Sequence, residues 1–359
     1  MNIAYIVPNL QQTGPIILVQ SLVRHLVNIV DKIDVFYIDN CEKPIHVDCQ
    51  IHKIFYNKPF NFDDYDIIHC HTAKADLYGF LWHRKMRRAK LITTIHQDTF
   101  ITESYRLGKF WGPIYTRIWL KVQNTLDGIV AISNQIRDTY QKYFTQKITT
   151  IYNGVDCEEG VINTQVYETI KNFKDKNHII LGTYALITRR KGLNQVIDFL
   201  ESNPTYKFVV IGDGVAKPEL EKSVAEKHLQ DRVLFLPHLD KPYLYLQNID
   251  IYVMASYSEG FGLAMVEAAL QQKPIVCTDL PSFHEIFPNG EAVFFEPNNI
   301  NSLKEALNTV SINISKYAEL CYNRSKSTFV AQKMADNHLN YYKNITETKK
   351  SYPYHEEYK

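Results

Sequence analysis

Two carboxylates bracket a glycine-containing loop in the C-terminal half of the chain. Glu259 precedes Gly260, Phe261 and Gly262, and Glu267 follows within a run of good helix formers. The unpaired N–H groups at a helix start attract anions, and glycines let a phosphate approach the backbone. The pattern therefore predicts a phosphate site. Because a carboxylate repels a phosphate, we expect the two glutamates to bind hydroxyl groups of a sugar or a ribose.

The elements around this loop follow a repeated strand–helix pattern. Short apolar, β-branched runs alternate with segments of helical period, which is typical of parallel sheets built from βαβ units. In the N-terminal half we expect strands at residues 2–7, 32–38, 51–55, 67–71, 90–96, 128–133 and 148–152. In the C-terminal half we expect them at residues 178–184, 207–211, 233–236, 251–254, 274–278 and 292–295. The sequence predicts an α/β protein with two doubly wound parallel sheets.

Length and charge exclude several classes of protein. The 359 residues suffice for two domains. The 40 Lys+Arg and 39 Asp+Glu leave a net charge of +1, which gives no general attraction to nucleic acid. The six cysteines are scattered, so neither disulfides nor structural zinc are expected. The chain has no long apolar run, and its first residues read as a strand rather than a secretory signal, so we expect a cytoplasmic protein.

The segment from Glu259 to Glu267 is similar to the E-x7-E element of retaining glycosyltransferases of family 4. These enzymes have the GT-B fold, in which two Rossmann-like domains face an interdomain cleft. Further matching motifs follow one another at residues 153–156 (Asn-Gly-Val-Asp), 190–192 (Arg-Lys-Gly), 211–214 (Ile-Gly-Asp-Gly), 273–276 (Lys-Pro-Ile-Val) and 284–285 (His-Glu). Their order and spacing extend the resemblance over nearly the whole chain.

The resemblance implies a transfer reaction. A sugar would move from a nucleoside diphosphate sugar, with UDP favoured over GDP, to a hydroxyl of a glycan or lipid-linked acceptor, with retention at the anomeric carbon. The acceptor hydroxyl would attack on the face that the diphosphate leaves, and the diphosphate would take up the proton. Bacterial cell-surface polysaccharide or lipopolysaccharide synthesis is the expected pathway.

The resemblance also predicts the domain organisation. Residues 1–155 would form a Rossmann-like acceptor-binding domain, and residues 178–325 a Rossmann-like domain that binds the nucleotide sugar. The polar segment 156–177 reads as an interdomain linker with a short helix. Residues 326–345 would form a helix that crosses back to the N-terminal domain, and residues 346–359 a polar tail.

A basic group is expected to bind the donor diphosphate. By resemblance this is Lys191, which precedes a glycine. The family often supplies a second cation about six residues earlier, but Ala185 and Leu186 stand there in this chain. Arg189 or Arg190 is the expected substitute.

The resemblance assigns separate roles to the two glutamates. Glu267 would hold the ribose hydroxyls of the nucleotide, and Glu259 would bind the transferred sugar. An exposed helix carboxylate is the alternative interpretation of Glu267. The donor phosphates are expected to lie against the loop backbone at Gly260, Phe261, Gly262 and Leu263.

Histidines end two strands of the N-terminal half. The carboxyl ends of strands in doubly wound sheets face the ligand, and His96 matches a family histidine near the reacting sugar. Alternatively, His96 is a structural strand-end residue. Of His69 and His71 we expect only one to face the ligand, and we favour His71 because it ends its strand. His71 and the nearby Asp98 are candidates for the acceptor side.

The first loop, residues 8–15, aligns with the glycine-rich first loop of the family. Gly14 is present, but Pro15 replaces a second glycine and removes an N–H group. Gly14 remains a candidate for donor binding.

No metal or cofactor is expected. Asp64-Tyr65-Asp66 fits the D-x-D pattern of metal-dependent transferases, but it precedes a strand at the end away from the ligand and reads as a turn. Lys191, a neighbouring arginine and a helix N-terminus would then neutralise the leaving diphosphate.

Two segments mix cations with aromatic residues. Residues 84–90 hold five basic residues and end a helical stretch that contains Tyr78, Phe80 and Trp82, and residues 105–121 mix aromatics with cations. Both fit an anionic inner-leaflet membrane surface. The alternative is that the cations favour a helix C-terminus and that the aromatics belong to the core.

Two other functions fit the fold class. A nicotinamide oxidoreductase needs G-x-G-x-x-G after the first strand, and residues 8–15 lack it. A catalytically inactive glycosyltransferase-like partner subunit would fit the absence of an arginine at positions 185 and 186.

Overall fold

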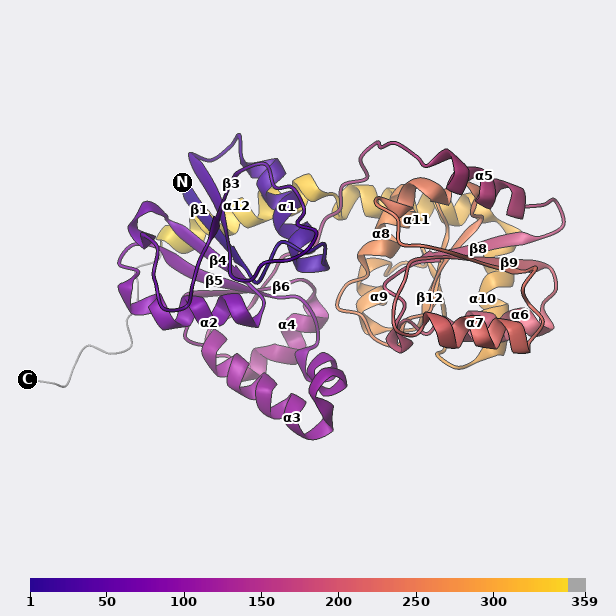
Figure 1. The fold of residues 1–359 in the computed structure, drawn as a ribbon, viewed down its shortest axis with the longest axis horizontal. Helices are drawn as coiled ribbons and strands as arrows, with labels where there is room; N and C mark the ends of the chain where they lie inside the picture. The colour runs from indigo at the N-terminus through magenta and orange to yellow at the C-terminus, as the bar shows by residue number, and fades with distance from the viewer. Residues whose placement is uncertain (348–359) are drawn as a thin grey trace, which may run out of the picture. The chain divides into compact units, whose positions relative to one another are not determined.

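The computed structural model describes residues 1–347 and divides into two compact units (Figure 1). Unit 1 comprises Met1–Gly154 and the C-terminal segment from Ala331, and unit 2 comprises Val155–Val330. Most of the predicted tail, residues 348–359, lies outside the described residues.

Unit 1 is built on a seven-stranded parallel sheet in the order β3-β2-β1-β4-β5-β6-β7. Its strands are β1 (Asn2–Val7), β2 (Lys32–Tyr37), β3 (Gln50–Lys53), β4 (Ile67–His71), β5 (Lys90–Ile95), β6 (Gly128–Ala131) and β7 (Thr149–Thr150). Its helices are α1 (Gly14–Leu26), α2 (Ala73–Trp82), α3 (Thr99–Gln123), α4 (Asn134–Tyr140) and α12 (Ala331–Glu347), with short 3-10 turns η1 (Phe62–Asp64), η2 (His83–Lys85) and η3 (Gln141–Tyr143).

Unit 2 repeats this plan with a six-stranded parallel sheet in the order β10-β9-β8-β11-β12-β13. Its strands are β8 (Ile179–Tyr184), β9 (Tyr206–Ile211), β10 (Val233–Leu236), β11 (Ile251–Met254), β12 (Ile275–Thr278) and β13 (Val293–Phe295). Its helices are α5 (Thr164–Phe173), α6 (Asn194–Ser202), α7 (Lys217–Glu226), α8 (Leu263–Leu270), α9 (Pro281–Ile286), α10 (Ile300–Ile312) and α11 (Ile314–Thr328), with 3-10 turns η4 (Arg189–Lys191) and η5 (Pro242–Asn248).

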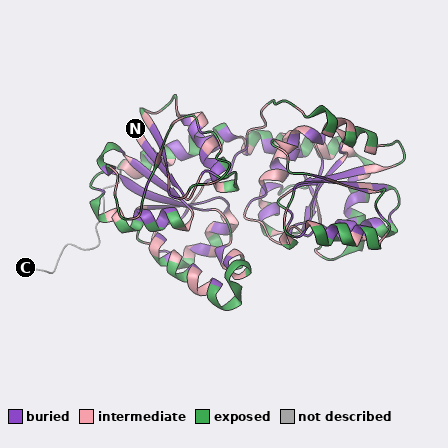
Figure 2. Ribbon diagram, viewed as in Figure 1, coloured by how far each residue is buried: buried purple, intermediate pink, exposed green. Residues whose placement is uncertain are grey.

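The predicted fold class is confirmed, and all thirteen predicted strands are present. The largest difference is at the sheet edge, where residues 148–152 were expected but β7 holds only Thr149–Thr150. An edge strand has one neighbour, so pairing stops where β6 ends. Figure 2 shows the strands as the buried layer of each unit and the outer helix faces as exposed.

Two helices pack against elements that are distant in the sequence. Helix α12 belongs to unit 1, where it packs beside α1 and contributes Met334 and Leu339 to the core. The predicted linker contains α5, which belongs to unit 2 and packs on η5. Ile170 is fully buried there, so most of this polar segment is an integral part of unit 2.

Each sheet reverses its strand order once, at its switch point, and the candidate site residues lie around these two points. In unit 1 the strand order reverses between β1 and β4, and in unit 2 between β8 and β11. Ligands of open α/β sheets bind outside the carboxyl ends of the strands at such a point. The loops that follow β4, β5, β8 and β11 carry most of the predicted site residues.

The core of unit 2 yields a stability prediction. Phe208 is fully buried in it, so Phe208→Ala should lower the free energy of unfolding by about 3–5 kcal/mol. Urea unfolding followed by circular dichroism measures this loss. Phe55→Ala is the control, because Phe55 is 56% exposed, and it should change the free energy by no more than about 0.5 kcal/mol. Equal effects of the two substitutions would contradict this core assignment.

Candidate active site

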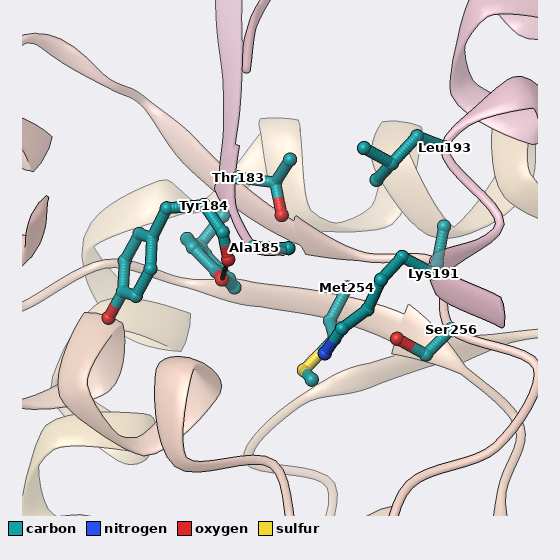
Figure 3. Close-up of a pocket in the computed structure, with 9 residues that line it drawn as sticks. Thr183, Tyr184, Ala185, Lys191, Leu193, Met254 and Ser256 are labelled. Carbon is teal, nitrogen blue, oxygen red and sulfur yellow. Dashed lines mark hydrogen bonds between the residues drawn. The ribbon is translucent and has the colours of Figure 1, made fainter. Parts of the chain in front are cut away.

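A pocket of about 200 Å³, including its open mouth, lies at the switch point of unit 2. Figure 3 shows the side chain of Lys191 extending among the lining residues. The pocket is formed by the ends of β8 and β11 and the loops that follow them. Its lining residues are Thr183, Tyr184, Ala185, Lys191, Leu193, Tyr252, Met254, Ala255 and Ser256.

Three side chains converge on Glu259 beside this pocket. Lys191 Nζ lies 2.6 Å from Glu259 Oε1, and Arg190 Nη1 lies 3.2 Å from Oε2. The Ser256 hydroxyl donates to Oε1 at 2.9 Å. Burial of Glu259 acts to raise its pKa, but the charges of Lys191 and Arg190 and these hydrogen bonds outweigh it and lower the pKa. The carboxylate is therefore ionised at neutral pH.

The backbone at Gly192 fixes the position of these cations. Gly192 has φ 60°, and a Cβ there would lie 2.1 Å from the carbonyl oxygen of Ala255. Only glycine permits this approach without a shift of the backbone. The Gln195 amide donates to the carbonyls of both Gly192 and Ala255. The loop that carries Lys191 is therefore held against the end of β11.

The two arginine candidates lie in different environments. Arg189 is 84% exposed and pairs with Glu219 at 2.9 Å. Arg190 pairs with Glu259 and also donates to the carbonyl of Ser258. The geometry therefore favours Arg190 as the second cation of the pocket.

Glu267 lies in a different environment from Glu259. It is partly buried on α8, and Tyr184 donates a hydrogen bond to its Oε2 at 2.6 Å. Desolvation raises the pKa of Glu267 to about 7, and the hydrogen bond from Tyr184 opposes this rise only in part, with no cation among residues 1–347 to lower the pKa further. Glu267 therefore exchanges a proton near neutral pH, and it is not the fully exposed helix carboxylate of the alternative interpretation.

The loop between β11 and α8 presents backbone rather than side chains. Gly260 and Gly262 have no side chain to contribute, and the Phe261 side chain is buried against Phe329, with ring centroids 5.4 Å apart. Helix α8 begins at Leu263 without a side-chain hydrogen bond to its first turn. This start is suited to bind an anion through backbone N–H groups.

Histidines gather at the switch point of unit 1. His71 Nδ1 lies 3.0 Å from His96 Nε2. Behind them, His69 Nδ1 lies 2.7 Å from the hydroxyl of Tyr342 and its Nε2 lies 2.8 Å from the hydroxyl of Thr94. His71 is fully buried, whereas His96 is only partly buried. The candidates His71 and His96 are thus brought together.

His69 and His71 do not point to opposite faces of β4, so alternation along the strand does not decide which of them faces the ligand. Their ring centroids are 4.3 Å apart, so both rings lie on the same face of β4. Side chains two residues apart in a strand point to the same face. His69 lies deeper in the sheet and His71 at its carboxyl end.

Burial keeps these histidines neutral. Desolvation lowers the pKa of His96 to about 3 and that of His338, on α12, to about 4. It also lowers the pKa of His69 and His71 well below the usual value. His338 lies 5.8 Å from His69 between ring centroids. At neutral pH the cluster offers hydrogen-bonding groups rather than positive charge.

The other two candidates of unit 1 are not brought to this cluster by any described contact within residues 1–347. Asp98 caps α3, where its carboxylate accepts from the Ile101 N–H at 3.2 Å and from the Tyr140 hydroxyl at 2.8 Å. Gly14 is the exposed first residue of α1, and a Cβ there would meet nothing within 4 Å. Asp98 thus has a structural role at a helix start.

Neither a metal-binding cluster nor a membrane-spanning helix is found among the described residues. Within residues 1–347, no three His, Cys, Asp or Glu side chains are grouped so that they could hold a metal ion. None of the helices in that range combines the length and the apolarity needed to cross a membrane.

Comparison with known proteins identifies the family. The pattern of Glycosyl transferases group 1 matches residues 168–327, and that of Glycosyltransferase Family 4 matches residues 50–159. The chain belongs to the family 4 glycosyltransferases. The two parallel α/β units of this glycosyltransferase are those of the GT-B fold, as predicted.

Relatives of the glycosyltransferase cover its full length. The O-antigen biosynthesis glycosyltransferase WclY of Escherichia coli is 28% identical over 96% of this chain and 99% of its own. The structure of HepE from Anabaena in complex with UDP superposes with a TM-score of 0.80 at 16% identity, over 96% of this chain and 100% of HepE. WaaG, a glycosyltransferase involved in lipopolysaccharide biosynthesis, gives a TM-score of 0.71 at 12% identity, over 96% of this chain and 100% of WaaG.

Sequence reasoning missed several residues of the glycosyltransferase that contact the candidates. Tyr184 binds Glu267 and Ser256 binds Glu259. Both lie at or just after predicted strand ends, the position that could have marked them. His338 and Tyr342 gave no such signal, because only the fold brings α12 to β4.

The histidine cluster predicts an acid-sensitive fold. The pKa of His338 is about 4 in the folded glycosyltransferase and about 6.5 in an unfolded chain. Unfolding therefore takes up a proton below about pH 6.5, so this contribution to stability is complete above that pH and is lost toward pH 4. His338→Gln should reduce the slope of the unfolding free energy between about pH 5 and 6 by about 1.4 kcal/mol per pH unit, the value for one proton.

Urea unfolding at several pH values measures this slope. His46→Gln is the control, because the His46 side chain is 85% exposed, and it should leave the slope nearly unchanged. An unchanged slope in His338→Gln would show that His338 is charged in the folded protein.

Proposed function

We propose that this glycosyltransferase moves a sugar from a UDP-sugar to a hydroxyl of a glycan or lipid-linked acceptor, with retention at the anomeric carbon. The convergence of Lys191 and Arg190 on Glu259, beside the start of α8, carries the proposal. Two cations and a helix N-terminus provide positive potential where a diphosphate would lie. These groups would stabilise the leaving diphosphate, so the proposal needs no metal ion.

The ion pairs suggest how the donor would bind. Glu259 forms ion pairs with both Lys191 and Arg190 in the structure. A diphosphate carries more charge than one carboxylate, so it would displace Glu259 from Lys191 and Arg190. The released carboxylate would then accept hydrogen bonds from hydroxyls of the transferred sugar.

Glu267 and His96 complete the proposed arrangement. Glu267, oriented by Tyr184, would bind the ribose hydroxyls. On unit 1, His96, held by His71, would offer a neutral hydrogen-bonding group to a sugar hydroxyl. The acceptor hydroxyl would attack on the face that the diphosphate leaves, and a phosphate oxygen would take its proton. The motif places no carboxylate as a nucleophile, which supports this order of events.

Relatives support the choice of donor and pathway. The HepE structures contain UDP or UDP-glucose, and several relatives are named as O-antigen glycosyltransferases, among them the mannosyltransferase C of Escherichia coli, which is 26% identical. We therefore propose a role in O-antigen or related polysaccharide biosynthesis. An inactive partner subunit is the alternative to an active enzyme.

Nucleotide binding gives the first test. UDP at about 100 times its dissociation constant should stabilise the protein by about 2.7 kcal/mol, measured by thermal unfolding alongside GDP, ADP, CMP and NAD. Glu267→Ala should reduce the UDP shift, because it removes the proposed ribose ligand. Glu305→Ala, an exposed carboxylate of α10, is the matched control and should retain the shift. A shift with NAD alone, or with no nucleoside diphosphate, would contradict the proposed donor site.

Substitutions in the ion triad should change UDP affinity in opposite directions. Lys191→Met removes a charge-assisted hydrogen bond, so UDP binding should weaken by roughly 10- to 100-fold, equivalent to about 1.5–3 kcal/mol. Glu259→Gln removes the competing carboxylate, so UDP binding should tighten by roughly two- to tenfold, while sugar transfer is lost. Isothermal titration calorimetry measures both affinities.

Arg189→Met, on the exposed arginine, is the control for the triad and should leave the affinity unchanged. Weaker UDP binding in Glu259→Gln would show that the carboxylate supports the diphosphate site instead of competing for it. A Glu267→Ala variant that still transfers sugar would contradict the proposed role of Glu267. A wild type that binds UDP but transfers no sugar would favour the partner-subunit alternative.

A further inference from the structure

Three loops of unit 2 meet at the side chain of Gln195, on α6. The first loop follows β8 and carries Lys191, the second follows β11, and the third joins β13 to α10. Gln195 is only 5% exposed. A buried amide needs partners for its nitrogen and for its oxygen. The hydrogen bonds of Gln195 therefore show which parts of the chain it joins.

The amide of Gln195 bonds to each of the three loops. Its Nε2 donates to the carbonyl oxygen of Gly192 at 3.2 Å and to that of Ala255 at 2.8 Å. Its Oε1 accepts from the N–H of Asn298 at 2.6 Å. Carbonyls only accept and backbone N–H groups only donate, so the reversed orientation of the amide would lose all three bonds. The three loops thus fix the amide in one orientation.

Asn298 extends this connection to the second loop. It has φ 61°, a left-handed conformation that asparagine adopts more readily than most residues. The Tyr257 hydroxyl donates to Asn298 Oδ1 at 2.7 Å. The N–H of Tyr257 in turn donates to the carbonyl of Arg190 at 2.8 Å. The connection therefore returns to the loop that carries Lys191.

These bonds close a hydrogen-bonded ring on both sides of Lys191. On one side, the carbonyl of Arg190 accepts from Tyr257. On the other side, the carbonyl of Gly192 accepts from Gln195. A Cβ on Gly192 would lie 2.4 Å from Gln195 Nε2, so the amide packs directly against this backbone. The turn from which the Lys191 side chain extends into the pocket is therefore held at both ends (Figure 3).

The ring differs from the ion pairs of the same loop in its response to a ligand. A diphosphate that displaces Glu259 from Lys191 and Arg190 would break both ion pairs. The side chains of the ring are neutral, and none of its bonds uses the Lys191 ammonium or the Glu259 carboxylate. Its bonds therefore persist when the ion pairs are exchanged. A lysine ammonium on a flexible stem needs such a fixed base to meet a phosphate in one geometry.

We propose that Gln195 is a positioning residue for donor binding, which acts through the ring on Lys191. Asn298 and Tyr257 complete the ring and hold the backbone of Arg190. This inference rests on the proposed function, because it takes the diphosphate of the donor as the ligand of the two cations. It adds three residues that the motifs did not mark and brings the loop after β13 into the donor site.

A double-mutant cycle tests whether Gln195 acts through Lys191. Gln195→Met keeps the length of the side chain but removes all three bonds, so UDP binding by the full chain should weaken roughly tenfold. In the Lys191→Met background the same substitution should weaken UDP binding by at most about twofold, because the group that it positions is gone. Isothermal titration calorimetry with UDP measures the four affinities.

A milder variant opens the ring at its exposed side. Tyr257→Phe removes the bond to Asn298 and leaves the backbone bond to Arg190, so UDP binding should weaken roughly two- to fivefold. The hydroxyl lies at the surface, so the fold should be retained. The circular dichroism spectrum and the unfolding temperature of each variant without UDP identify any variant that has misfolded.

Asn203→Ala is the matched control. Asn203 is a second buried amide, 6% exposed, at the other end of α6, where its Nδ2 donates to the carbonyl of Phe199 at 2.7 Å. Its loss should lower stability without changing the affinity for UDP. An equal loss of UDP affinity in this control would show that any weakening of α6 disturbs the site, and would overturn the proposal.

The remaining outcomes separate this inference from the proposed function. Wild-type UDP affinity in Gln195→Met, or the same loss with and without Lys191, would overturn the positioning role alone. Failure of the wild type to bind UDP would overturn the proposed donor site and this inference with it.

Discussion

A carboxylate held between two cations organises the loops at the switch point of unit 2. Glu259 comes from the loop after β11, whereas Lys191 and Arg190 come from the turn after β8. A buried charge is costly unless it is paired, so the three side chains keep both loops in place while no ligand is present. The same dependence makes the site responsive, because any stronger anion that enters must rearrange this triad. The cations proposed to bind a diphosphate are therefore already in place without it.

The two carboxylates of one short segment are driven to opposite behaviour by their surroundings. Glu259 meets two cations and keeps its charge, whereas Glu267 meets the Tyr184 hydroxyl and has a pKa of about 7. Environments that separate the pKa values of neighbouring acids are how a site assigns them different tasks. At the switch point of unit 1 the opposite holds, because desolvation keeps the buried His71 and the partly buried His96 neutral. One sheet therefore presents charge at its switch point, and the other presents uncharged hydrogen-bonding groups.

The amino-acid sequence predicted the strands well, because apolar β-branched runs record burial directly. The ends of elements were predicted less accurately, as at Thr149–Thr150, because the length of an edge strand depends on the strand with which it pairs. The direction of a side chain was harder still to predict from the sequence. The sequence left Arg189 and Arg190 equivalent, and only the turn at η4 sends one to Glu219 and the other to Glu259.

Composition also cannot distinguish a surface from a core. Residues 78–90 and 105–121 are similar in composition, since both contain aromatic residues and several cations. What separates them is backbone geometry. Gly108 breaks helix α3, and Gly112 lets its second arm pack closely against the first, so residues 109–111 between these glycines stay exposed. In the other segment, Met86 is buried and draws its flanking cations onto the fold. Two glycines thus decide which of two similar sequences is left exposed.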